Sequence, residues 1–449
     1  MNTGSDRPTK TVSVLTATAI VVANMVGTGI FTSLGFQVVK LNTGFSIMAL
    51  WFVGGVCALC GAFSYAELGA ALPRSGGEYN FLGRIYHPAV GFLAGFVSAT
   101  VGFAAPVALA AMAFGGYIHG VWPGANPEVL SVALVVVATI PLLRDLKFGS
   151  FFQDAMTILK IALILVIIAA GFLVKQPQAI SFMPAKVDGG LIMSSAFAGN
   201  LFYVMYSYSG WNASTYIVGE LRNPGRSIPL SVGLGTLLVT GLYLAVNAVF
   251  LRAAPISAME GKPEVAQAAG TYLFGPQGGN IIALFICVGL VSTVSSMMWI
   301  GPRVTETMGE DLGALRVLGQ VNARGIPFIA TVLQFVIAVA LILTSSFEQV
   351  MSYIQFSLTI CSALAVFGVY VLRWRQPGLS RPYRAWGYPV TPAIFLAISG
   401  WMMWCMLSNT DTLKSSLLGF ATILLGLLIY FLSPKNKPSA SFTNAPNET

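Results

Sequence analysis

Charged residues are scarce in this chain. Only 9% of its 449 residues are Asp, Glu, Lys or Arg, whereas 56% are apolar and the mean hydropathy is +0.77. A soluble domain carries roughly 25% charged residues, which it needs to cover its surface. Apolar runs of about 18 residues or more recur from end to end, and each is long enough to cross a bilayer as a helix. The sequence therefore excludes a soluble globular protein and predicts a polytopic membrane protein.

Histidine and cysteine are also rare. The two histidines, His87 and His119, stand near the ends of apolar runs and have no metal-ligand spacing around them. All five cysteines fall inside apolar runs, and the one close pair, Cys57 and Cys60, has no second pair to complete a zinc site. We expect them to be small packing residues, and we expect no metal, no cofactor and no enzyme activity, because intramembrane catalysis needs clustered acid, base or nucleophile groups.

No polar stretch is long enough to form a separate soluble domain. We expect one all-α bundle of about twelve transmembrane helices, preceded by a tail at 1–11 and followed by a disordered tail at 433–449, which is rich in Pro, Ser and Asn. The predicted spans are residues 12–39, 45–72, 89–120, 128–143, 151–174, 191–219, 229–251, 279–308, 326–345, 350–373, 389–408 and 413–432.

The net charge of +8 is distributed unevenly along the chain. With the N-terminus placed inside, seventeen of the 24 Lys and Arg residues fall on the cytoplasmic side and six on the outer side, and only Lys160 lies within a span. Such an excess of basic residues in the inner loops is typical of membrane proteins. The charge distribution therefore predicts a multi-pass protein of the inner or plasma membrane with both termini cytoplasmic. It does not indicate nucleic-acid binding.

Two of the predicted spans are interrupted by small and polar residues, the first at 27–29 and the sixth at 207–212. Glycine costs about 1 kcal/mol relative to alanine inside a helix, and unwound backbone is tolerated in a membrane only where protein or a wet cavity surrounds it. A single G-x-G could simply allow close helix packing. Interruptions in the first and sixth spans favour an inverted five-plus-five repeat, with 12–174 and 175–373 as the repeats, 374–432 as two further spans, and a substrate between the repeats.

Several short motifs follow one another along the chain. They are Gly27–Phe31, Tyr65–Leu68, Ser75–Tyr79, Tyr206–Asn212, Glu220–Pro224, Gly301–Arg303 and Met308–Asp311. In this order and spacing, the sequence resembles the amino acid–polyamine–organocation superfamily and, within it, the L-type amino acid transporters. The resemblance implies a leucine-transporter-like fold in which helices 1 and 6 are discontinuous.

Animal members of the L-type family pair with a heavy subunit through a cysteine in the loop between spans 3 and 4. Here that loop, Val121–Asn126, contains no cysteine. We therefore expect a bacterial permease that acts without a disulfide-linked heavy subunit.

An amino acid zwitterion needs partners for both of its charges. The N–H groups that begin the second half of span 1 suit the carboxylate, and the free carbonyls of both breaks suit the ammonium group. Glycine keeps side chains from holding the ligand away from the backbone. The predicted substrate-binding residues are Val26, Gly27, Thr28, Gly29, Ile30, Tyr206, Ser207, Ser209 and Asn212.

Two of these residues have alternative interpretations. Tyr206 matches the gating aromatic of the family, but it could equally be a packed core tyrosine. Asn212 could contact the substrate or cap the resumed helix. Between His87 and Tyr117, span 3 holds no acid and no strong base, which favours a neutral amino acid over a cationic one or a polyamine.

Lys160 lies about a third of the way into span 5. An ammonium group in the membrane costs several kcal/mol without partners, so it either extends to the interface or has a partner in the bundle. We predict that it reaches the break of span 1 and hydroxyls of span 8 such as Ser292, Ser295 or Ser296. Sodium-coupled relatives hold an ion there, and the matching lysine of the resembling families implies sodium independence. The predicted coupling and gating residues are Lys160, Tyr206, Ser295 and Ser296.

Five charged residues near the expected cytoplasmic ends of spans are interpreted as salt bridges of a gate or loop. They are Glu67, Asp154, Glu220, Arg303 and Glu306.

The sequence thus predicts secondary active transport of neutral L-amino acids by alternating access, independent of sodium, as an exchanger or a proton symporter. The expected partners are the amino acid, the lipid bilayer and, for a symporter, protons. The alternatives are an intramembrane enzyme, an amino acid sensor that does not transport, and a transporter of cationic amino acids or polyamines.

Overall fold

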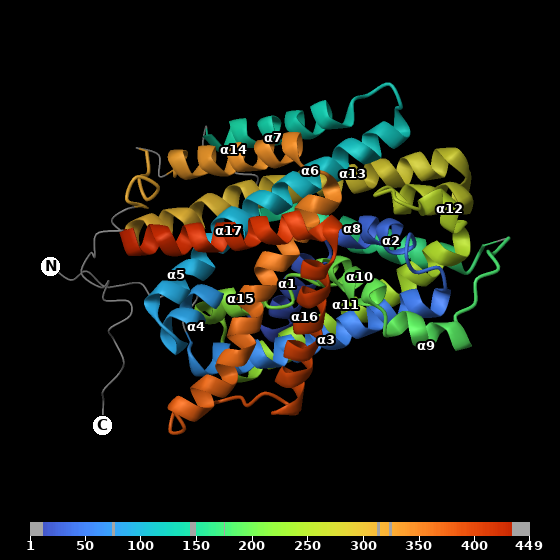
Figure 1. The fold of residues 1–449 in the computed structure, drawn as a ribbon. Coiled ribbons are helices and arrows are strands. Elements are labelled where there is room, and N and C mark those ends of the chain that lie inside the picture. The colour runs from blue at the N-terminus through green and yellow to red at the C-terminus, as the bar shows by residue number, and fades with distance from the viewer. Residues whose placement is uncertain are drawn as a thin grey trace.

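The structure, a computed structural model, is a bundle of helices (Figure 1). It describes residues 12–73, 77–143, 150–174, 176–311, 315–322 and 326–432. Within these ranges no β-strand occurs, and the only pairing of extended backbone is an isolated bridge between Val12 and Leu221. The predicted all-α class is confirmed.

The helices follow in chain order. The first half of the chain contains α1 (Val14–Met25), α2 (Gly29–Gln37), α3 (Gly44–Ala71), α4 (Gly77–Ile85), α5 (Pro88–Val97), the π-helix η1 (Ser98–Ala104), α6 (Ala105–Val121), α7 (Pro127–Leu143) and α8 (Ser150–Gly171). The second half contains α9 (Lys186–Ile192), α10 (Ser195–Ser207), the 3₁₀ helix η2 (Ala213–Glu220), α11 (Pro224–Ala253), α12 (Ile256–Met259), α13 (Val265–Asp311), α14 (Phe328–Thr344), α15 (Phe347–Arg375), α16 (Val390–Ser408) and α17 (Thr410–Leu432).

Seven helical stretches of the described chain are long and apolar enough to cross a membrane, and α1 with α2 can form an eighth crossing that is bent by 42°. Helices α7, α8 and α14 supply shorter apolar crossings, and α10 with η2 occupies the sixth predicted span. These elements correspond one by one to the twelve predicted spans. In Figure 1, α4 and α5 lie at one end of the bundle and α9 and α12 at the other, called below the α4 end and the α9 end.

One predicted boundary is wrong. Span 8 was expected to begin at residue 279, but α13 begins at Val265 and is kinked at Gly275, whose φ of +80° interrupts the helical backbone. Residues 265–278, which the sequence analysis assigns to a loop, are therefore part of this kinked helix. Span 3 is not uniformly α-helical, because the π-helix η1 separates α5 from α6.

The centre of the bundle is built on α3. It packs against α10, α11, α15 and α16, and α11 packs in turn against α1 (Figure 1). Gly55 lets α3 and α11 approach closely, because a Cβ at this position would lie 2.6 Å from Cγ2 of Thr240. Helices α1 and α10 are thereby held in the middle of the protein.

Candidate functional site

The first span is broken where the sequence predicts it. Helix α1 ends at Met25, Val26 forms its C-cap, and α2 begins at Gly29 after the bend. The side chain of Thr28, the N-cap of α2, makes no capping hydrogen bond. The N–H groups in the first turn of a helix have no partner within the helix, and they carry the positive end of its dipole. The start of α2 is therefore suited to an anionic group.

The break in span 6 takes a different form. Helix α10 ends at Ser207, the next residues form turns, and Gly210 has a φ of +100° that other residues rarely adopt. The chain resumes as the 3₁₀ helix η2, not as an α-helix. Asn212 stands at the N-cap of η2, but its side chain makes no capping bond and donates weakly to the Tyr216 hydroxyl at 3.5 Å. The capping interpretation of the Asn212 side chain is wrong.

The two breaks lie against each other. A Cβ at Gly29 would lie 2.7 Å from Cα and 2.9 Å from Cβ of Ser207, and one at Gly210 would lie 2.9 Å from the carbonyl of Asn24. The glycine at position 29 is therefore required for the contact between the breaks. Gly27 does have space, since the nearest atom to a Cβ there is the Met25 carbonyl oxygen at 3.9 Å.

A tyrosine that sequence analysis missed connects both breaks. The Tyr243 hydroxyl, on α11, lies 2.6 Å from the carbonyl oxygen of Met25 and 3.0 Å from that of Ser207, which are the last residues of α1 and α10. Its ring is fully buried and packs edge-on against Trp51. A tyrosine in the middle of an apolar span needs a partner for its hydroxyl, and this was the available signal. One hydroxyl has one proton for two acceptors, so it stabilises both carbonyls without saturating either.

We predict that Tyr243→Phe weakens amino acid binding about tenfold, because the ring stays and only the link between the breaks is lost. Tyr353→Phe is the matched control, since that hydroxyl pairs with Thr422 at 2.9 Å, between α15 and α17. Binding of a labelled amino acid to the two purified variants measures the effect. Equal amino acid affinities of the two variants would show that the Tyr243 hydroxyl does not contribute to binding.

Serine side chains add a second connection between α2 and α10. The hydroxyls of Ser33 and Ser207 lie 3.0 Å apart, and Ser207 also donates to the carbonyl of Tyr203 at 2.9 Å. The Ser207 side chain is thus occupied by helix contacts. Its carbonyl oxygen, which accepts from Tyr243, keeps a second lone pair for a ligand.

The nine predicted substrate-binding residues all lie in the two breaks or the turns beside them. Val26, Thr28, Ile30, Tyr206 and Ser207 are buried. Among the predicted carbonyl acceptors, that of Tyr206 accepts from the N–H of Ser209 at 3.0 Å and also from the N–H of Tyr208, so both of its lone pairs are engaged. The structure brings these residues together but leaves both interpretations of Tyr206, gate or core residue, in place.

Lys160 points from α8 into the bundle. Its Nζ donates to the Thr293 hydroxyl on α13 at 2.8 Å, and its stem packs on Gly289, where a Cβ would lie 3.1 Å from the lysine Cε. The small cavity around it is also lined by Gly27, from the break of span 1, and by Phe31 of α2. The structure does not support extension of the ammonium group to the interface.

The span 8 hydroxyl that accepts from Lys160 belongs to Thr293, a residue that the sequence analysis did not name. Thr293 takes that role because it lies one turn from Gly289, whose missing side chain makes room for the lysine stem. Ser296 is half-buried about one turn further along, and the buried hydroxyl of Ser295 has no hydrogen-bond partner within the described part of the chain.

Aromatic side chains close the α9 end of the site. The ring of Phe36 on α2 stacks on Tyr203 of α10 at 5.5 Å and on Phe347 of α15 at 5.6 Å. The Tyr203 hydroxyl donates to Glu348 at 2.5 Å. The halves of the broken spans are thereby attached to α15 at this end.

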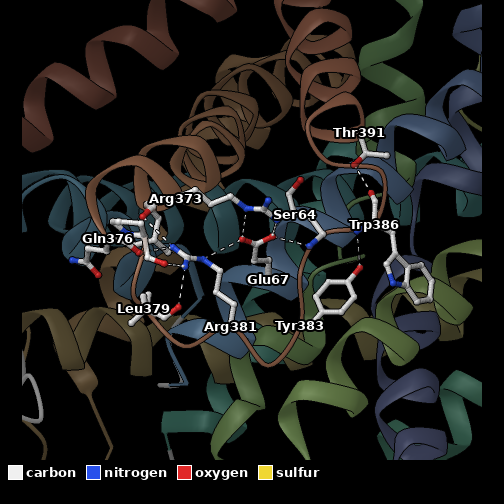
Figure 2. Close-up of polar contacts among 12 residues, drawn as sticks. Ser64, Glu67, Arg373, Gln376, Leu379, Arg381, Tyr383, Trp386 and Thr391 are labelled. Atoms are coloured by element: carbon white, nitrogen blue, oxygen red, sulfur yellow. Dashed lines mark hydrogen bonds and ion pairs between the residues drawn. The ribbon is translucent and has the colours of Figure 1, made fainter. Parts of the chain in front are cut away.

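An ion cluster lies at the C-terminal end of α3, where it joins α3 to α15 (Figure 2). The buried carboxylate of Glu67 on α3 accepts two hydrogen bonds from Arg373, at 2.8 and 2.7 Å, and a third from the N–H of Ala385 at 2.7 Å. The guanidinium of Arg381 lies 3.6 Å from the same carboxylate and donates to backbone carbonyls of the segment after α15. The predicted salt bridge of Glu67 is confirmed, and it joins α3 to α15 and to the following loop.

Two of the other predicted interface charges, Arg303 and Glu306, lie on α13. Arg303 donates to the carbonyl of Trp299 at 2.9 Å and lies over that indole ring. Glu306 is half-buried in α13. The side chains of Asp154 and Glu220 lie outside the described part of the structure.

Within the described ranges, no group of three or more His, Cys, Asp or Glu side chains could hold a metal ion. The five cysteines are unpaired and buried.

Comparisons with known proteins agree on one family. The model of the amino acid permease family matches residues 12–436. The chain is 29% identical to the serine/threonine exchanger SteT of Bacillus subtilis (strain 168), over 98% of this chain and 100% of that protein. It is 26% identical to b(0,+)-type amino acid transporter 1 of Homo sapiens, over 94% and 88% of the two chains. It is 25% identical to large neutral amino acids transporter small subunit 2 of Mus musculus, over 94% and 81%.

Proposed function

Since this chain belongs to the amino acid permease family of membrane transporters, we propose that it carries neutral L-amino acids by sodium-independent alternating access. The observation that carries the proposal is the pair of unwound segments held together by Tyr243, with the uncapped start of α2 on one side and the end of α10 on the other. N–H groups can bind the substrate carboxylate, and carbonyl groups can bind its ammonium.

The charges around the breaks support a neutral substrate. Residues 24–30 and 206–212 include no charged side chain, so nothing in them would neutralise a charged substrate side chain. Lys160 lines the same small cavity as Gly27, and its ammonium group lies at the Thr293 hydroxyl. It would repel a cationic side chain or a polyamine in a medium of low dielectric constant.

Lys160 also supports sodium independence. Its ammonium group joins α8 to α13 beside the first break, where a bound cation would otherwise make such a link. Similarity to a serine/threonine exchanger favours exchange of small neutral amino acids over proton symport as the transport mode.

Three further features belong to the same proposal. The inverted repeats span 12–174 and 175–373, so that α1 with α2 and α10 with η2 are their corresponding first members. Both termini face the cytoplasm of a cell whose plasma or inner membrane holds the protein. No heavy subunit is disulfide-linked to it, since the loop at 121–126 has no cysteine.

Uptake of labelled serine into proteoliposomes, competed by each of the twenty amino acids, tests the proposal. We expect competition by small neutral amino acids, and none by lysine, arginine or glutamate, with choline in place of sodium. Competition by arginine as strong as by serine would favour the cationic alternative. Binding without any uptake or exchange would favour a sensor.

A further inference from the structure

A buried carboxyl group lies at the α4 end of the bundle, apart from the ion cluster of Glu67. Glu78, in the first turn of α4, is only 5% exposed. Its Oε1 accepts hydrogen bonds from the Tyr65 hydroxyl on α3 and, at 3.1 Å, from the Ser362 hydroxyl on α15. Three elements thus meet at one carboxyl whose donors are uncharged.

In the part of the chain that the structure describes, no cation forms an ion pair with this carboxyl. Arg74 lies outside that part. Burial raises the pKa of Glu78 above the usual range, and the two hydroxyl donors offset only part of that rise. The titratable groups that interact with it are Tyr65 on α3, Cys361 on α15 and Tyr216 on η2. The charged or titratable groups at the opposite end of α4 are Arg84, His87 and Arg375.

Side chains next to Glu78 also contact the break in span 6. The Tyr65 ring packs edge-on against Trp211 with ring centroids 4.7 Å apart, and Trp211 follows the positive-φ Gly210. On the other side, the Tyr216 ring covers Gly77, where a Cβ would lie 2.8 Å from its Cδ1. The environment of Glu78 therefore changes whenever the sixth span moves against α3 or α4.

We propose that Glu78 is a proton-binding site that links the transport cycle to pH at the α4 end. The inference rests on the proposed function, because alternating access has to open this end of the bundle. Opening admits water to the carboxyl, so its affinity for the proton falls to that of an ordinary glutamate. A proton from the solvent therefore binds the closed form and is released on opening.

The sign of the linkage follows from this difference. The closed form binds more protons than the open form between the ordinary pKa of glutamate and the raised one of the buried carboxyl. Mildly acidic pH consequently stabilises the closed α4 end, and the stabilisation is lost as the pH rises.

Infrared difference spectroscopy of the purified full-length protein, titrated between about pH 5 and pH 8, measures this proton directly. We expect a C=O band of a protonated carboxyl that titrates in this range in the wild type and is missing from Glu78→Gln. Glu348→Gln, which alters an exposed carboxyl, should keep the band. An unchanged band in Glu78→Gln would overturn the proposal.

Tyr65→Phe provides a second test, because it keeps the ring against Trp211 and removes one donor to the carboxylate. The midpoint of the infrared titration should move to higher pH by about 1 pH unit. A midpoint that does not move, or moves to lower pH, would contradict the assignment.

Amino acid exchange by proteoliposomes then tests the link to transport. We expect wild-type exchange to change with pH at the α4 end and Glu78→Gln to be insensitive to it over the same range. Identical pH dependence in both would overturn the coupling. If neither protein transported any amino acid, the proposed function would fail, whereas the infrared result would still decide whether Glu78 binds the proton.

Discussion

Lys160→Ala is expected to lower amino acid uptake about a hundredfold while the protein still folds and inserts in the membrane. The substitution removes the ammonium group that donates to Thr293 and empties the space beside Gly27, so the first break loses its connection to α13. Uptake by proteoliposomes at matched protein content measures the loss. Lys160→Met is the matched control for packing, because it keeps most of the stem against Gly289 without the charge, and it should be as inactive as the alanine variant.

Lys160→Arg separates the two transport modes. Arginine keeps the charge but does not release its proton at working pH, so a cycle that depends on deprotonation of this residue should stall. An exchanger that uses the charge only as a fixed brace should keep part of its activity. Wild-type uptake should be unchanged when choline replaces sodium. Collapse of wild-type uptake without sodium, or a fully active Lys160→Ala, would show that the lysine does not stand in for an ion.

Gly29→Ala should reduce amino acid binding by at least about tenfold. The added Cβ would lie 2.7 Å from the backbone Cα of Ser207, so the two breaks have to move apart. Such a movement displaces the start of α2 from the carbonyls at the end of α10, and a zwitterion can no longer reach both. A scintillation-proximity assay on the purified variant measures the affinity.

Gly199→Ala is the control for this experiment. It lies on α10, and a Cβ there would meet no atom within 4 Å. It should bind as the wild type does and unfold at the same temperature or slightly higher, since alanine favours the helix. Gly27→Ala also has space for its Cβ, so it should fold normally while it narrows the cavity beside Lys160. Wild-type affinity in Gly29→Ala would show that substrate binding does not depend on the contact between the breaks.

The order of the spans and the location of both breaks could be predicted because each depends on local sequence. An apolar run of sufficient length becomes a crossing wherever it occurs, and glycine weakens a helix at its own position. The α-helical start of α13 and the π-helix η1 could not be predicted in this way. Both depend on packing against neighbouring helices, and this packing cannot be derived from local hydropathy.

The partners of the site residues were the weaker part of the prediction. The chemistry of Lys160 and Glu67 indicates that each needs a partner, but Thr293 and Arg373 lie 133 and 306 residues away along the chain. To choose between Thr293 and the serines near it, one must know how α13 is oriented about its own axis. Tyr243 was missed for a similar reason, because its role depends on the meeting of three helices.

The central claim is that the two breaks together bind one neutral amino acid. A cryo-EM structure of the protein with bound serine tests it most directly. We predict that the substrate carboxylate lies within about 3 Å of N–H groups at Thr28, Gly29 or Ile30, and that its ammonium contacts carbonyl oxygens at the end of α10. Serine bound elsewhere, with no contact to either break, would contradict the claim.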